Sequence, residues 1–148
     1  MTEWPPRDAA EFKEWLLDEL PILKERREML EHRVATAEQV MRSPQWSQIQ
    51  IARTTTSDPT FNLAARWVEE LPILRFEIAA IDAILDEYRR AKVALTDRQR
   101  KIIESLYEYY LGPTEVCVGL SISRSTYDRD HHDALALMVS ILEWRREA

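Results

Sequence analysis

Side chains able to recognise nucleic-acid bases gather in one stretch near the C-terminal end of this 148-residue chain. They are Ser123, Arg124, Ser125, Thr126, Asp128, Arg129 and His132. If the stretch is a helix, its spacing turns Tyr127 inward and leaves polar groups on the outward face. An arginine can donate two hydrogen bonds to guanine, and an aspartate can accept one from cytosine. The pattern therefore predicts a helix that reads bases in the major groove of double-stranded DNA.

The residues before this stretch predict the rest of a helix-turn-helix. Thr114 is expected to cap a first short helix, because Pro113 prevents the preceding helix from continuing. Val116, Cys117 and Leu120 would form its apolar face. Ile122 is the apolar plug of the turn, and Ser123 caps the second helix. Two helices joined by a tight turn also occur in proteins that never touch DNA, so the motif alone leaves both interpretations open.

Another helix is predicted ahead of the motif and should support it. Thr96 and Gln99 have the spacing of a capping box, and the helix is expected to run to Gly112. On it, Arg98 and Lys101 are candidate contacts to the phosphate backbone. Thr114 is a third candidate, because a helix N-terminus attracts phosphate. We assign residues 95–148 to a DNA-binding domain.

The charge of the chain limits the type of DNA binding. The net charge is −6, which argues against a non-specific polycation. Residues 95–148 hold seven Lys or Arg against nine Asp or Glu. Asp128, Asp130 and Asp133 are expected near the reading surface, where they would repel phosphate. The composition therefore favours specific binding with few phosphate contacts.

Residues 1–94 predict an all-α N-terminal region with a mid-chain loop at 43–58. Only two glycines occur in the whole chain, too few for a protein built from strands and tight turns. Pro21 either kinks a continuous helix or begins a new one that runs to Met41. In the loop, Trp46 is expected to dock on the core, with a partner contact as the alternative. Asp58-Pro59 predicts the start of the next helix.

That next helix carries apolar residues at spacings of three and four, typical of a coiled coil. They are Leu71, Leu74, Ile78, Ile81, Leu85 and Tyr88. We expect this seam to pair with the earlier helix at 23–41 as an antiparallel hairpin within one chain. A homodimer through the same seam is the alternative.

The sequence offers no arrangement for catalysis. It contains no glycine-rich phosphate loop, no cysteine cluster and no His-Glu-x-x-His motif, so we expect no enzymatic activity and no cofactor. His131 and His132 are adjacent on a helix and point about 100° apart, so no metal site is expected. Cys117 is expected to be a small core residue in a reducing cytoplasm. No segment predicts a membrane span or a signal peptide.

Residues 91–142 resemble known families of transcription proteins. Residues 95–100 and 115–123 are similar to region 4 of sigma factors. Residues 122–127, with Ala134 and Leu135, resemble ArpU/RinA-type regulators of phages and prophages. Those regulators also have a helical N-terminal half and a Ser/Thr-rich segment in mid-chain, here at 54–57.

The resemblance implies a three-helix, sigma-region-4-like helix-turn-helix and a regulator of phage or prophage late genes. It also implies the cytoplasm of a bacterial host, and contact with the host RNA polymerase by analogy. Two positions depart from the pattern. Ser121 stands where glycine is usual and must adopt a left-handed backbone, and Cys117 stands where alanine is usual.

Two other functions remain as alternatives. A phage DNA-packaging protein of the small-terminase type also joins a helix-turn-helix to an oligomerising helical part, and would form a ring-shaped oligomer. A protein–protein adaptor with a sigma-like fold would bind no DNA even at low salt, where weak phosphate contacts become visible.

Overall fold

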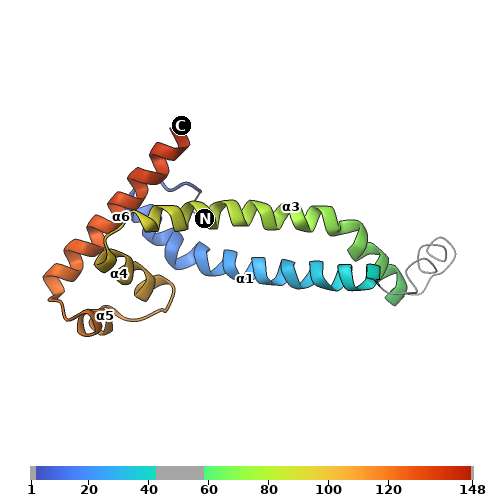
Figure 1. Cartoon of the computed structure of the whole chain (residues 1–148), viewed down its shortest axis with the longest axis horizontal. Helices are drawn as coiled ribbons and strands as arrows, with labels where there is room; N and C mark the ends of the chain where they lie inside the picture. The colour runs from blue at the N-terminus through green and yellow to red at the C-terminus, as the bar shows by residue number, and fades with distance from the viewer. Residues whose placement is uncertain (1–2, 43–58, 148) are drawn as a thin grey trace. The chain divides into compact units, whose positions relative to one another are not determined.

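The computed structural model describes the backbone of residues 3–42 and 59–147, and the side chains of residues 3–42 and 65–144. Within these ranges the chain is helical and contains no strand, so the all-α prediction is confirmed. Figure 1 shows α1 (Ala9–Arg42), α3 (Pro59–Val93), α4 (Asp97–Tyr107), α5 (Pro113–Leu120) and α6 (Arg124–Glu147). The predicted loop at 43–58, including Trp46 and Asp58, lies outside the described residues.

α1 is one continuous helix that contains Pro21. Pro21 therefore does not begin a new helix. The carboxylate of Asp8 accepts a hydrogen bond from the backbone N–H of Glu11 at 2.8 Å and caps the start of α1. Pro72 lies inside α3 in the same way. Each proline removes one helical hydrogen bond. The buried side chains around them, Leu16, Leu20, Leu71 and Leu74, offset that loss by anchoring the helices to the core.

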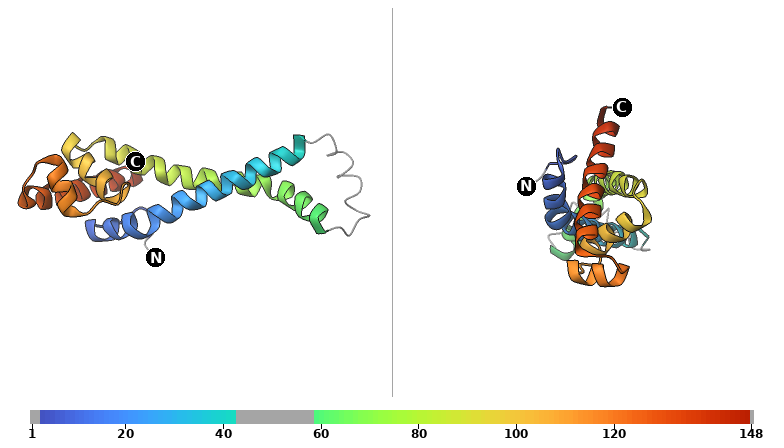
Figure 2. Two further views of the ribbon diagram at one scale, coloured as in Figure 1. Left: turned by 90° about the horizontal axis from the view of Figure 1, so that it is seen from below. Right: turned by 90° about the vertical axis from the view of Figure 1, so that its left-hand side faces the viewer.

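One compact unit comprises residues Leu23–Ala83. In it, the later part of α1 and the earlier part of α3 run antiparallel beside each other (Figures 1 and 2). The seam residues Leu71, Leu74 and Ile81 are buried, as are Leu30 and Ala37 of α1. Ion pairs flank this core: Arg26–Glu77 at 2.7 Å, Arg75–Glu38 at 2.8 Å, Arg33–Glu70 at 3.4 Å, and Arg27–Asp82. The seam is therefore covered, at least in part, by the chain's own α1.

The other compact unit comprises residues Met1–Ile22 and Ile84–Ala148. Its aromatic core joins α1 to the end of α3, with the ring centroids of Trp15 and Tyr88 5.9 Å apart. The indole of Trp4 lies against Trp15 in a tilted arrangement, with ring centroids 4.5 Å apart, and donates a 2.6 Å hydrogen bond to Glu87. Lys92 connects α3 to α4, since its ammonium lies 3.2 Å from the carboxylate of Glu104 in α4 and 2.7 Å from that of Glu108, the C-cap residue. The beginning of α1 is thus part of the unit that contains α4, α5 and α6.

These bounds differ from the predicted division into residues 1–94 and 95–148, which stays a prediction. Among the described helices, none combines the length and the apolar character needed to cross a bilayer.

Candidate nucleic-acid interface

The start of α4 is fixed by a complete capping box, as predicted. The Gln99 backbone N–H donates to the Thr96 hydroxyl at 3.2 Å, and the Thr96 N–H donates to the Gln99 side chain at 3.1 Å. Ile102, Ile103 and Tyr107 then turn one face of α4 into the core. The capping box therefore sets where this supporting helix begins.

The predicted end of α4 at Gly112 is wrong. The helix ends at Tyr107. Tyr110 follows in the left-handed region with φ 56°, and the Leu111 N–H donates to the Ser105 carbonyl at 2.8 Å. This reversal leaves Tyr109, Tyr110 and Leu111 exposed. A bulky residue with positive φ carries strain, and no feature of the sequence marks Tyr110 for it.

The prediction that Thr114 caps α5 is also wrong. Gly112 is the N-cap and makes no side-chain cap, while Pro113 occupies the first turn and Thr114 follows it inside the helix. Proline suits this place because its missing N–H would have no partner there. Thr114 is exposed at the helix N-terminus. Its predicted phosphate contact stays a prediction, with Glu115 adding a negative charge to the same turn.

The turn after α5 has the backbone that the sequence predicts. Ser121 adopts φ 56° and ψ 45°, the left-handed conformation. Its N–H donates to the Val118 carbonyl at 3.2 Å, and the Ile122 N–H donates to the Cys117 carbonyl at 3.0 Å. Carbonyls at the end of α5 are thereby satisfied as the chain reverses.

An apolar cluster holds α4, α5 and α6 together. Its buried members are Ile102, Val116 and Tyr127, one from each helix. Leu106, Cys117, Leu120 and Ile122 pack around them. Ile122 thus contacts the cluster from the turn, and Cys117 is half-buried against it, as their positions predict.

The first turn of α6 is capped by Ser123, as predicted. The Thr126 N–H donates to the Ser123 hydroxyl oxygen at 3.2 Å, and that hydroxyl donates to the Thr126 hydroxyl at 2.9 Å. The Ser125 hydroxyl lies 3.2 Å from the same oxygen. Three hydroxyl groups therefore lie together at the beginning of the helix.

The outward face of α6 carries the residues expected to read bases. Ser123, Arg124, Ser125, Asp128, Arg129 and His132 are exposed, Thr126 is half-buried and Tyr127 is buried. The Arg124 guanidinium lies 5.3 Å from the centre of the Tyr127 ring and 3.4 Å from Asp128. Arg129 makes no ion pair within the described part of the chain. It is thus the cation on this face best able to accept an external partner.

Two charged residues, Arg98 of α4 and Asp130 of α6, pair with each other. Asp130 does not lie on the outward face of α6, contrary to the prediction, since it is 7% exposed and accepts a hydrogen bond from the Arg98 guanidinium. The pair joins α4 to α6, so Arg98 has a structural contact in addition to its predicted phosphate contact. Lys101 is exposed on α4. Of the three predicted repelling aspartates, only Asp128 and Asp133 are exposed.

His131, a half-buried histidine next to this face, has a shifted pKa that the sequence does not predict. His131 lies 2.6 Å from the Tyr107 hydroxyl and stacks on Tyr127 with centroids 5.7 Å apart. Burial lowers the pKa of His131 to about 4, and the charge of Lys13 adds to this shift. These residues line a cavity of about 240 Å³ together with Leu17 and Leu111. His131 is therefore neutral at pH 7 and adds no positive charge next to the outward face of α6.

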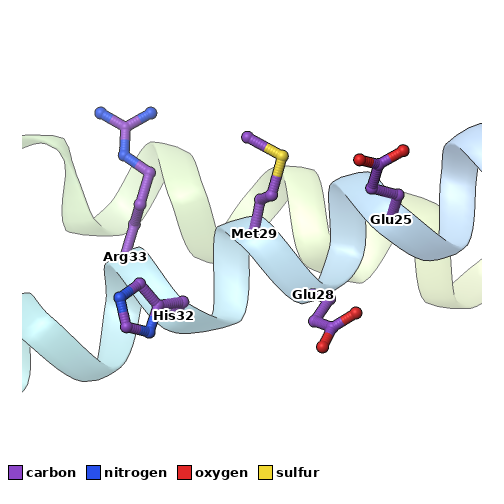
Figure 3. Close-up of a pocket in the computed structure, with 5 residues that line it drawn as sticks. All are labelled: Glu25, Glu28, Met29, His32 and Arg33. Carbon is purple, nitrogen blue, oxygen red and sulfur yellow. The ribbon is translucent and has the colours of Figure 1, made fainter.

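A second hollow, of about 530 Å³, lies on α1 in the other unit. Its lining residues are Glu25, Glu28, Met29, His32 and Arg33. Figure 3 shows Glu25, Met29 and Arg33 projecting to one side of α1 and Glu28 to another, so these groups do not converge on one point. Across the described residues, no three His, Cys, Asp or Glu side chains gather as metal ligands would. This hollow does not have the arrangement of a catalytic site.

Comparison with known proteins adds no further constraint: no family model, curated protein or solved structure matches this chain.

Proposed function

We propose that this chain is a site-specific DNA-binding regulator of transcription, of the phage or prophage type that its motifs resemble. The start of α6 enters the major groove, where Arg124 or Arg129 donates to guanine and Asp128 accepts from cytosine. The observation that carries this proposal is the face of α6. Its capped first turns present hydroxyl, guanidinium and carboxylate groups outward, while Tyr127 anchors the same turns in a three-helix cluster.

The charges near this face favour selective binding. Lys101 and Arg129 are exposed without ion pairs in the described residues, whereas Arg98 contacts Asp130 and Arg124 contacts Asp128. Few cations remain to neutralise phosphates, so base contacts must supply much of the affinity. A salt-dependence slope of roughly −2 to −4 follows, shallower than that of a protein that neutralises many phosphates.

Selection from genomic DNA tests the proposal. The full chain is mixed with sheared host and phage DNA, and the retained fragments are sequenced. The proposal expects enrichment of a short common sequence, and a salt slope of the size given above. Equal retention of all fragments, or no retention at low salt, would contradict it.

A protein–protein adaptor is the second candidate, and one observation favours it. The loop between α4 and α5 exposes Tyr109, Tyr110 and Leu111, which lie next to one another in the chain. Exposed aromatic groups of this kind are frequent in protein interfaces. The adaptor function predicts that Tyr110→Ala abolishes capture of RNA polymerase while no DNA is retained.

A further inference from the structure

The outer face of α3 carries apolar side chains that are exposed within the described part of their own unit. Phe76 is 75% exposed and Ile73 is 60% exposed. Ala79, Ala80 and Ala83 continue the same face and are also exposed. Residues 73, 76, 80 and 83 follow the three-four spacing of a helix face, on the side of α3 opposite the buried seam. We name these five residues the outer stripe.

The outer stripe differs from an ordinary solvent-facing helix surface because it contains no charged residue over three turns. The charged residues adjacent to it in the sequence are Asp82, which pairs with Arg27 of α1, and also Arg75 and Glu77. The last two likewise reach back to α1, where Arg75 lies 2.8 Å from Glu38 and Glu77 lies 2.7 Å from Arg26. A partner placed on the stripe would therefore meet apolar groups between Glu69 and Glu87, which lie on the same helical face one turn beyond its two ends.

The order of side-chain sizes along the stripe points to its occupant. The two large residues lie at one end and the alanines at the other. When two α3 helices pack antiparallel about a two-fold axis near residue 78, Ile73 faces Ala83 of the other copy and Phe76 faces Ala80. Large side chains then fill the spaces above small ones in every layer. A parallel arrangement would place Phe76 against Phe76 and leave gaps between the alanines.

We propose that a second copy of this chain packs on the outer stripe, forming an antiparallel α3–α3 dimer. This interface is separate from the heptad seam of residues 71–88. A specific interface buries at least about 1,000 Å² in total, so five residues per copy need their flanking residues to reach even this lower limit. The dimer is therefore reversible and depends on protein concentration.

Sedimentation of the full chain without DNA tests the proposal. Wild-type protein at tens of micromolar is expected to be dimeric. Phe76→Glu is expected to raise the dissociation constant at least about 30-fold, because Phe76 is the largest buried group of the interface. Met29→Glu is the matched control, since Met29 is an apolar residue of α1 with 60% exposure, and it should leave the dimer unchanged. Circular dichroism checks that both variants remain helical.

Cysteine crosslinking tests the antiparallel register. In a Cys117→Ala background, the double variant Ile73→Cys/Ala83→Cys is expected to form disulfide-linked dimers, whereas Ile73→Cys alone is not. Positions 73 and 83 of one helix are about 15 Å apart, too far for an internal disulfide. A monomeric wild-type protein, a dimer that persists in Phe76→Glu, or crosslinking of Ile73→Cys alone would overturn the proposal. None of these results depends on whether the chain binds DNA.

Discussion

At the scale of single residues, Ser121 adopts a left-handed backbone conformation that glycine would adopt more easily, and the turn after α5 still forms. This left-handed backbone costs a residue with a Cβ atom about 1 kcal/mol relative to glycine. We expect Ser121→Gly to raise the free energy of unfolding by about 0.5–1 kcal/mol, measured by urea denaturation. Ser125→Gly, in the helical first turn of α6, should lower it by a similar amount. Equal effects of the two substitutions would show that Ser121 is not strained.

His131 gives a prediction about acid stability. Because burial holds its pKa at about 4 in the folded chain, the unfolded chain binds a proton at a higher pH, near 6.5. The titration of His131 does not change stability above about pH 6.5, and the free energy of unfolding falls by at most about 3 kcal/mol as the pH drops from about 6.5 to 4. The groups facing it are Lys13, Tyr107, Asp128 and His132.

The measurement compares unfolding free energies at pH 7 and pH 4.5. His131→Gln should show a smaller loss of stability than wild type, because glutamine does not titrate. His132→Gln is the control, since His132 is exposed, and it should behave like wild type. An unchanged loss in His131→Gln would mean that other groups cause the acid sensitivity.

The burial of Asp130 could not be predicted from the sequence. The helical spacing predicts the inward position of Tyr127 and the outward position of Arg129 correctly. It cannot show that Arg98, 32 residues earlier, pairs with Asp130 and makes its burial acceptable. Long-range pairs of this kind depend on tertiary packing, which local patterns do not contain.

At the scale of helices, start signals proved more informative than end signals. The capping box at Thr96 predicts the start of α4 because the side chains that satisfy the first N–H groups are adjacent in sequence. The end of α4 depends on the strained backbone of Tyr110, and the start of α5 on Gly112, whose cap has no side chain. Thr96 and Ser123 cap their helices through side chains that the sequence marks, whereas the end of α4 and the start of α5 have no such mark, and the predictions for those two boundaries are wrong.

The two threonines give a matched test of these assignments. Thr96→Ala removes a cap that accepts a hydrogen bond and should lower the free energy of unfolding by about 1 kcal/mol. Thr114→Ala removes an exposed hydroxyl that caps nothing and should change it by less than about 0.5 kcal/mol. Thermal denaturation of both variants measures the difference. A larger loss for Thr114→Ala would reverse the placement of the α5 cap.

At the scale of the whole molecule, the all-α class follows from composition, but the grouping of segments does not. The beginning of α1 and the end of α3 belong to the unit that holds α4, α5 and α6, through Trp4, Trp15 and Tyr88. These residues are far apart in the sequence and share no pattern that would connect them. A dimer formed through α3 would bring two reading helices into one particle, which suits a site with two half-sites.

The central claim, that the start of α6 reads DNA bases, is tested most directly by the affinity of Arg129→Ala for a selected genomic fragment. Fluorescence anisotropy compares it with wild type and with Arg89→Ala, which removes the same charge from an exposed position on α3.

We predict that Arg129→Ala weakens binding to the selected fragment by about 1–3 kcal/mol and reduces its preference over a scrambled sequence. Arg89→Ala should stay within about twofold of wild type on both DNAs. Equal affinities and equal preferences for the two variants would contradict the claim.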